Sequence, residues 1–160
     1  MKANNKQYDA IFATDIATIG IQLDGSKLTK VDYLKHRKNK KPTTSPAERV
    51  QKKVKRFLNP RSRIKDLKIE VLLDVTPFQE KVLKQLMQIP YGETRTYGEI
   101  AKKLKTSPRA VGNACRNNPV PIIIPCHRVV AANGIGGYDG ATQGATLDIK
   151  VQLLQLEGVI

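Results

Sequence analysis

Residues 121–129 read Pro121-Ile122-Ile123-Ile124-Pro125-Cys126-His127-Arg128-Val129, and they place a thiol, an imidazole and a guanidinium directly after an apolar run. A cysteine beside a histidine can supply a nucleophile, because the thiolate rather than the thiol attacks electrophiles. In an extended chain adjacent side chains point to opposite faces, so Cys126 and His127 cooperate only if the backbone turns or a water relays the proton. The alternative is that Cys126 is an inert core cysteine.

The composition of the 160 residues indicates a polyanionic partner. Lys and Arg outnumber Asp and Glu by 28 to 14, an excess that most often means nucleic acid and less often a membrane surface. No apolar run approaches the roughly 20 residues that a bilayer-spanning helix needs, and the N-terminus lacks the apolar core of a secretion signal. The two cysteines lack CxxC spacing, so we expect no metal site, no disulfide framework and a reducing, cytoplasmic location.

The first part of the chain, residues 1–73, is predicted to be a small domain rich in β-strands. Runs with β-branched or aromatic residues predict strands over 8–14, 18–23 and 28–34, and Asp24-Gly25 predicts the turn between the last two. The basic run 35–41 is either a solvated loop or a patch that contacts phosphates.

A helix and a further strand are expected to complete this part. Ser45-Pro46-Ala47-Glu48 is typical of a helix start with Ser45 as N-cap, and the helix should end near Leu58, before Asn59-Pro60. The apolar residues of 64–73 alternate enough to predict another strand.

The second part, residues 74–160, is predicted to be largely helical. Thr76-Pro77 caps a helix with apolar residues at helical spacing, which are Phe78, Val82, Leu83, Leu86 and Ile89. Short helices over 96–104 and 109–116 follow, and a last helix is expected over 147–157. The two short helices have the shape of a helix-turn-helix, in which small residues would let the second helix approach the floor of a DNA groove. A purely structural helix pair is the alternative.

Three segments together carry a specific resemblance. They are 121–129, Arg109-Ala110-Val111-Gly112 and Asn118-Pro119-Val120, and they resemble the O6-alkylguanine-DNA alkyltransferases, or methylated-DNA–protein-cysteine methyltransferases, from about residue 76 to 158. The resemblance implies an α+β protein in which an N-terminal ribonuclease-H-like α/β domain precedes a helical catalytic domain of winged-helix or helix-turn-helix type. It implies a single-use enzyme without a cofactor. The alkyl group would move irreversibly from O6 of guanine, and from O4 of thymine, in duplex DNA to the protein's own cysteine.

The resemblance also implies a role for each residue of the catalytic centre. Cys126 would accept the alkyl group, and His127 would deprotonate it through a water. Glu157 would hold His127, and Asn118 would brace the turn that leads to the active site. Tyr97 would crowd the target phosphate and donate a hydrogen bond toward guanine N3.

Further residues are implied at the DNA and around the flipped base. Arg109 would enter the base stack and fill the gap that the guanine leaves. The other side chains expected at the DNA are Tyr97, Ser107, Ala110, Gly112, Arg116 and Arg128. The backbone carbonyls of Cys126 and Val129 would accept hydrogen bonds from the guanine amino group. The residues expected to line the base pocket are Val129, Gly137, Tyr138 and Asp139.

Two features depart from the family pattern, and two competing functions stay open. The chain is longer than the pattern between Tyr138 and Lys150, and Asp139 stands where the family commonly has a small or basic residue. Beside a monomeric repair protein, the sequence allows a non-catalytic binder of alkylated DNA, against which Cys126 argues. It also allows a thiol hydrolase, for which no oxyanion-hole signature is evident.

Overall fold

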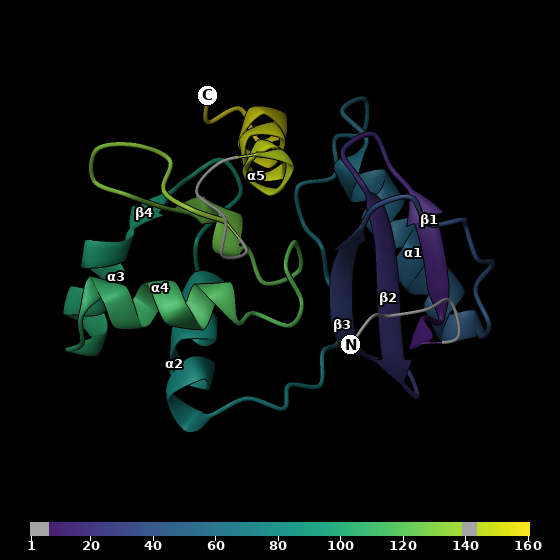
Figure 1. Ribbon diagram of the computed structural model, residues 1–160, viewed down its shortest axis with the longest axis horizontal. Coiled ribbons are helices and arrows are strands. Elements are labelled where there is room, and N and C mark those ends of the chain that lie inside the picture. The colour runs from purple at the N-terminus through teal and green to yellow at the C-terminus, as the bar shows by residue number, and fades with distance from the viewer. Residues whose placement is uncertain (1–6, 139–143) are drawn as a thin grey trace. The chain divides into compact units, whose positions relative to one another are not determined.

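The computed structural model describes residues 7–138 and 144–160, and the chain divides into two compact units, Met1–Asp74 and Val75–Ile160. The first unit combines a small sheet with one helix, and the second is built mainly of helices (Figure 1). Across the described residues, no helix is both long enough and apolar enough to cross a membrane.

The first unit contains a three-stranded antiparallel sheet. Strands β1 (Ala10–Ala13), β2 (Thr18–Asp24) and β3 (Lys27–Leu34) lie in the order β1-β2-β3, so each strand pairs with its neighbour in sequence. Gly25 lies in the β2–β3 turn with a φ of +62°, a conformation that costs glycine little. All three predicted strands and the predicted turn are therefore confirmed.

Helix α1 (Ser45–Leu58) covers one face of this sheet (Figure 1). It buries an apolar stripe made of Ala47, Val50, Val54, Phe57 and Leu58. The helix ends where predicted, but its N-cap is Thr44 rather than Ser45, because the Thr44 hydroxyl accepts the backbone N–H of Ala47. Pro46 fits this start because the first N–H groups of a helix have no intrahelical partner.

The strand predicted over 64–73 is wrong. This segment touches the sheet at one point only, where Leu28 donates its N–H to Glu70 and accepts from the N–H of Leu72, both at 2.9 Å. Alternation alone was a weak signal here, because the polar positions of the segment and Leu72 are exposed and so no continuous face is buried.

The second unit contains four α-helices among the described residues, α2 (Pro77–Leu86), α3 (Tyr97–Leu104), α4 (Pro108–Arg116) and α5 (Ala145–Leu156). Thr76 caps α2 as predicted, with a reciprocal hydrogen bond from its own N–H to the Gln79 side chain. Phe78, the first of the apolar residues at helical spacing, is 38% exposed, since the buried stripe of α2 begins one turn later at Val82.

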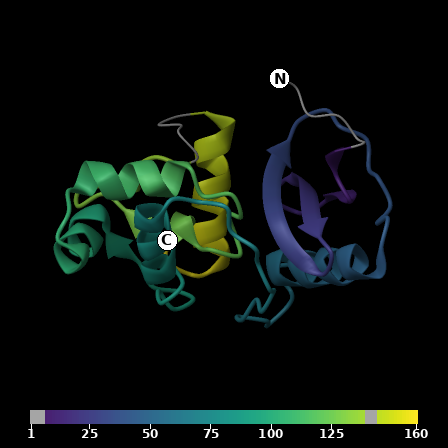
Figure 2. The same ribbon diagram turned by 90° about the horizontal axis from the view of Figure 1, so that it is seen from below.

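Helices α3 and α4 lie side by side and are joined by the short turn 105–107, in which Lys105 adopts the left-handed conformation (Figure 2). Two very short parallel strands, β4 (Arg95–Thr96) and β5 (Val129–Val130), position the functional residues. Strand β4 directly precedes Tyr97, and β5 directly follows Cys126-His127-Arg128. This pairing therefore fixes the start of α3 beside the chain that carries the thiol.

Candidate active site

The segment that leads to the thiol is a tight, braced turn. The Asn118 amide donates to the carbonyl of Ile124 at 2.9 Å, and its oxygen accepts the N–H of Val120 at 3.0 Å. Within this turn Ile122 has a φ of +77°, which is strained for a β-branched residue by about 1–3 kcal/mol. Asn118 is buried, so its two hydrogen bonds hold a backbone that local preference alone would not adopt.

At Cys126 the backbone turns, so the extended geometry considered for the sequence does not apply. Residues Cys126–Arg128 form the 3₁₀ turn η2, closed by a hydrogen bond from Arg128 N–H to the carbonyl of Pro125 at 3.0 Å. Cys126 is 5% exposed and His127 is fully buried. Neither cysteine of the chain forms a disulfide.

Glu157, which follows the last turn of α5, binds both side chains next to Cys126. One carboxylate oxygen lies 2.7 Å from His127 Nε2, and Arg128 donates from Nε and Nη2 to the two oxygens at 2.8 Å each. Burial by itself would raise the pKa of Glu157, but the hydrogen bonds from His127 and Arg128 more than offset it and hold that pKa at about 2. Glu157 is therefore ionised at neutral pH, where its carboxylate is hydrogen-bonded to the His127 imidazole.

His127 is held as a neutral imidazole. Its burial lowers its pKa, although the hydrogen bond and charge of Glu157 act in the opposite direction. With Nε2–H donated to Glu157, the neutral tautomer leaves a lone pair on Nδ1. Within the described part of the chain, Nδ1 is buried and has no hydrogen-bond partner. The ring therefore has an acceptor available for a proton.

Arg128 requires a correction, because it was expected at the DNA. The structure leaves it only 8% exposed, with its guanidinium bound to Glu157, donating to the carbonyl of Ile89 at 2.8 Å and lying over the Tyr91 ring. A guanidinium that is buried and bound in this way positions Glu157 and is not exposed for contact with a phosphate.

Lys150 was not singled out from the sequence, yet it is the most deeply buried cation of the site. Its ammonium donates to the carbonyls of Val129, Ile135 and Gly137 at 2.7, 2.7 and 2.9 Å, and the residue has no exposed surface. Burial lowers its pKa to about 8, while the charges of Cys126 and Cys115 act to raise it. One signal was available: Lys150 lies seven residues before Glu157 on the buried face of α5, with Leu153 and Leu154 between them.

Tyr97 lies against Gly136 and Gly137 and close to the ammonium of Lys150. The Tyr97 hydroxyl donates to the carbonyl of Gly137 at 3.4 Å, and its ring lies 5.8 Å from the Lys150 ammonium. A side chain at Gly136 would meet the Tyr97 ring at 3.0 Å, and Gly136 has a φ of +81°, so only glycine fits there. Burial, and then the nearby cysteines, raises the pKa of Tyr97 to about 12. Tyr138 is buried, and Asp139 lies outside the described residues.

Helix α4 presents a polar, positively charged face. Arg109, Gly112, Asn113 and Arg116 recur at helical spacing on its outer side, and a side chain built at Gly112 would meet nothing within 4 Å. Ala110 is half-buried, and Ser107 caps the helix by accepting the Ala110 N–H at 3.1 Å. The predicted DNA residues therefore fall on one helix, except for Tyr97 and Arg128. Among the described residues no three His, Cys, Asp or Glu side chains are grouped to hold a metal ion.

Comparison with known proteins shows the family of the chain. The family model described as 6-O-methylguanine DNA methyltransferase, DNA binding domain, matches residues 77–159. A methylated-DNA--protein-cysteine methyltransferase of Methanocaldococcus vulcanius is 60% identical over 70 residues, a match that spans 44% of this chain and 44% of that relative. The chain therefore spans less than half the length of that curated relative in the match.

Solved structures match over nearly the whole chain. The Mycobacterium tuberculosis OGT in complex with DNA is 33% identical with a TM-score of 0.75, covering 92% of this chain and 90% of that one. An O6-methylguanine DNA methyltransferase from Methanococcus jannaschii is 36% identical with a TM-score of 0.68, covering 94% and 93%. The likeness thus includes the mixed α and β architecture of both units.

Proposed function

Because this chain belongs to the 6-O-methylguanine DNA methyltransferase family, we propose that it repairs duplex DNA by moving an alkyl group from O6 of guanine onto Cys126. The observation that carries the proposal is the buried Cys126 beside a neutral imidazole whose Nε2–H is held by the Glu157 anion. This arrangement needs no cofactor, because the nucleophile and its base both belong to the chain.

The reaction is a single displacement. The Cys126 proton passes through a water to Nδ1 of His127, and Glu157 stabilises the imidazolium that forms. The thiolate sulfur then forms a bond to the alkyl carbon while the bond from that carbon to O6 breaks, and guanine leaves as an anion with the electron pair. One proton is taken up by that anion and one is released by the His127 imidazolium, so guanine and His127 both end neutral. The product is a thioether, which has no easily hydrolysed bond, so each molecule acts once.

The base has to leave the helix before the buried sulfur can reach it, at a cost of a few kcal/mol. The pKa of Tyr97 is about 12, so its hydroxyl stays protonated, and it would exchange its 3.4 Å hydrogen bond to the Gly137 carbonyl for one to guanine N3. The carbonyl of Val129 already accepts from Lys150, and that of Cys126 accepts from the Val129 N–H. Each carbonyl oxygen has two lone pairs, so both still have capacity for the guanine amino group. Tyr138 and Gly137 would complete the proposed pocket.

The outer face of α4 is the proposed contact with the duplex. Arg109 is exposed on the first turn of α4, where it can enter the stack and replace the flipped guanine, and Gly112 lets the backbone approach the groove floor. The proposal includes the finer expectations for the fold, a ribonuclease-H-like first unit and a winged-helix second unit. It also includes a monomer, a cytoplasmic location and activity on O4 of thymine.

A mass measurement after incubation with duplex DNA that contains O6-methylguanine tests the proposal. We expect a gain of one methyl group on Cys126 that saturates at one equivalent and disappears in Cys126→Ala. The matched control is Cys115→Ala, which should react normally because burial raises the pKa of Cys115 and keeps it a thiol. Without any mass gain the chain would be a non-catalytic binder, and turnover beyond one equivalent would indicate the hydrolase.

A further inference from the structure

The positive charge of this protein is concentrated in the unit that lacks Cys126. Residues 1–74 contain 18 of the 28 Lys and Arg but only 8 of the 14 Asp and Glu, so this unit has a formal charge of +10 and the other unit +4. The α4 face of the second unit therefore accounts for little of the excess. Some other surface holds most of it.

One part of the first unit contains half of its cations. Between residues 45 and 68 there are nine Lys and Arg but only two acidic residues, Glu48 and Asp66. Both acidic residues form exposed ion pairs with neighbouring lysines, at 3.3 and 3.5 Å. Such exposed pairs contribute little to stability and leave the net charge of the segment at +7.

Helix α1 arranges these cations in a row. Arg49, Lys52, Lys53 and Arg56 are exposed and recur at positions i, i+3, i+4 and i+7, on the side of the helix that faces away from its buried stripe. The four define a stripe of like charge, in which each i, i+4 pair destabilises the helix by about 0.2–0.5 kcal/mol. A bound polyanion would offset this repulsion, because its negative charges attract all four cations.

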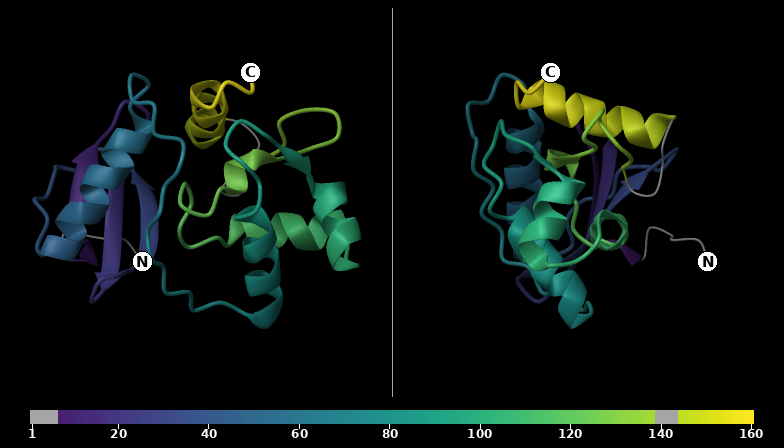
Figure 3. Two further views of the ribbon diagram at one scale, coloured as in Figure 1. Left: turned by 180° about the vertical axis from the view of Figure 1, so that it is seen from behind. Right: turned by 90° about the vertical axis from the view of Figure 1, so that its left-hand side faces the viewer.

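The chain that follows α1 adds further cations beside this stripe. It turns back along the helix, where the Lys53 ammonium donates to the carbonyl of Lys68 at 2.9 Å (Figure 3). This segment adds exposed cations at Arg61, Arg63, Lys65 and Lys68. We call the eight residues of the helix and the segment together the α1 basic face.

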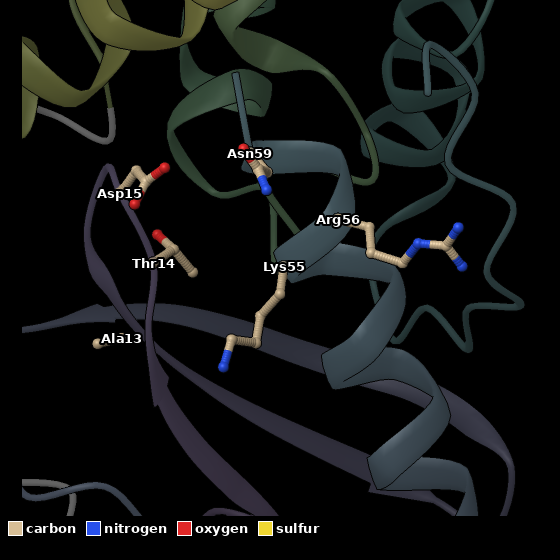
Figure 4. Close-up of a pocket in the computed structure, with 6 residues that line it drawn as sticks. All are labelled: Ala13, Thr14, Asp15, Lys55, Arg56 and Asn59. Atoms are coloured by element: carbon tan, nitrogen blue, oxygen red, sulfur yellow. The ribbon is translucent and has the colours of Figure 1, made fainter. Parts of the chain in front are cut away.

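The pocket at the end of α1 borders this face and shares Arg56 with it. It has a volume of about 370 Å³ and is lined by Ala13, Thr14, Asp15, Lys55, Arg56 and Asn59 (Figure 4). Asp15 and the C-terminal carbonyls of the helix disfavour an anion there. Figure 4 shows that the Arg56 guanidinium extends away from Asp15.

We infer that the α1 basic face is a second, sequence-independent binding surface for the phosphate backbone of duplex DNA. The stripe from Arg49 to Arg56 spans about 10 Å of helix, and B-DNA has one phosphate per strand every 3.4 Å, so the stripe matches about three phosphates. The face holds no exposed large apolar side chain that would suit an apolar partner. The choice of DNA among polyanions rests on the function proposed above.

The test is the salt dependence of binding to an unmodified duplex, measured by fluorescence anisotropy on the full chain. The variant carries Arg49→Gln, Lys52→Gln, Lys53→Gln and Arg56→Gln, because glutamine preserves helix propensity. The matched control removes four charges from the same unit outside the face, with Lys27→Gln, Lys35→Gln, Lys38→Gln and Lys41→Gln, all at exposed lysines.

The expected result is a shallower salt dependence in the α1 variant alone. Each lost phosphate contact lowers the slope of log Kobs against log salt by about 0.9, or about 3.5-fold in affinity between 50 and 200 mM salt. Loss of two to three contacts should therefore remove roughly 10- to 40-fold of that salt effect. An unchanged slope, or an equal change in the control variant, would overturn the inference. The inference would also be overturned if the wild-type protein bound polyglutamate more tightly than the DNA duplex and lost that binding in the α1 variant.

Methyl transfer from free O6-methylguanine base separates the two proposals. The α1 variant should methylate Cys126 from the free base at the wild-type rate, because the base does not use the face. If neither the duplex nor the free base methylates the wild-type protein, the proposed function fails, while the slopes still decide the role of the α1 basic face.

Discussion

Replacing Glu157 by glutamine removes the one carboxylate that binds both His127 and Arg128. The pKa of Glu157 is about 2 in the folded protein against an ordinary value of 4.5, a difference worth about 3 kcal/mol of stability when the group is ionised. Breaking a buried ion pair by removing one partner costs a similar ~3–5 kcal/mol. We therefore expect Glu157→Gln to lower the free energy of unfolding by about 3 kcal/mol at pH 7.

The sign of the pH dependence follows from the depressed pKa. The stabilisation by the carboxylate is complete above pH 4.5 and is lost as the pH falls toward about 2, where the wild-type carboxyl group is protonated in the fold. At pH 3 the difference between wild type and Glu157→Gln should therefore shrink to about 1 kcal/mol. Urea unfolding of both proteins at the two pH values measures it.

The control is Glu80→Gln, which removes an exposed carboxylate paired with Lys84 on α2 and should change stability by less than about 0.5 kcal/mol at either pH. A loss below about 1 kcal/mol for Glu157→Gln at pH 7 would refute the reasoning. So would a loss that stays the same at pH 3, because the stabilisation would then not come from the ionised carboxylate.

Three further predictions concern the turn that Asn118 braces, helix α4 and the protein methylated at Cys126. Asn118→Ala should lower the free energy of unfolding by about 1–3 kcal/mol in urea titrations, because it leaves the N–H of Val120 unpaired and removes one of the two donors to the carbonyl of Ile124, which keeps the N–H of Cys126; a loss under 1 kcal/mol would contradict the bracing role. Gly112→Ala should raise stability by up to about 1 kcal/mol yet weaken duplex binding in anisotropy titrations, because the added methyl group meets only the partner; unchanged binding would exclude a close approach. Methylation of Cys126 would remove the thiolate that can act as a counter-charge to Lys150. It should therefore lower the thermal midpoint of unfolding more in the wild type than in Lys150→Met, and equal shifts in the two proteins would exclude a charge effect.

The elements that sequence predicted well are those with strong local signals. Thr76-Pro77 and the Asp24-Gly25 turn determine chain direction within a few residues, so they need no tertiary partner to be recognised. The predicted strand over 64–73 failed because alternation says nothing about whether a partner strand is available along its length. Whether a segment pairs as a strand depends on the fold of the whole first unit.

The candidate catalytic residues and the contact between Glu157 and His127 were predicted through the family resemblance, but the contacts of Arg128 and Lys150 were not. Arg128 follows His127 in sequence and looks like one more cation for DNA, yet a carboxylate 29 residues away binds it in the interior. Lys150 is equally hidden, because lysine is almost never fully buried unless its ammonium is paired. Only the spacing of Lys150 and Glu157 on one face of α5 could have shown that both side chains point inward.

The buried charges around Cys126 would stabilise the thiolate that the proposed reaction requires. Among the described buried residues, the charged ones are Arg128, Lys150 and Glu157, so two cations face one anion while His127 is neutral. In the proposed reaction Cys126 gives up its proton, and its thiolate would supply the second anion, a charge that acts to raise the pKa of Lys150. Alkylation would convert that sulfur into a neutral thioether, so the buried ammonium would lose this counter-charge in the product.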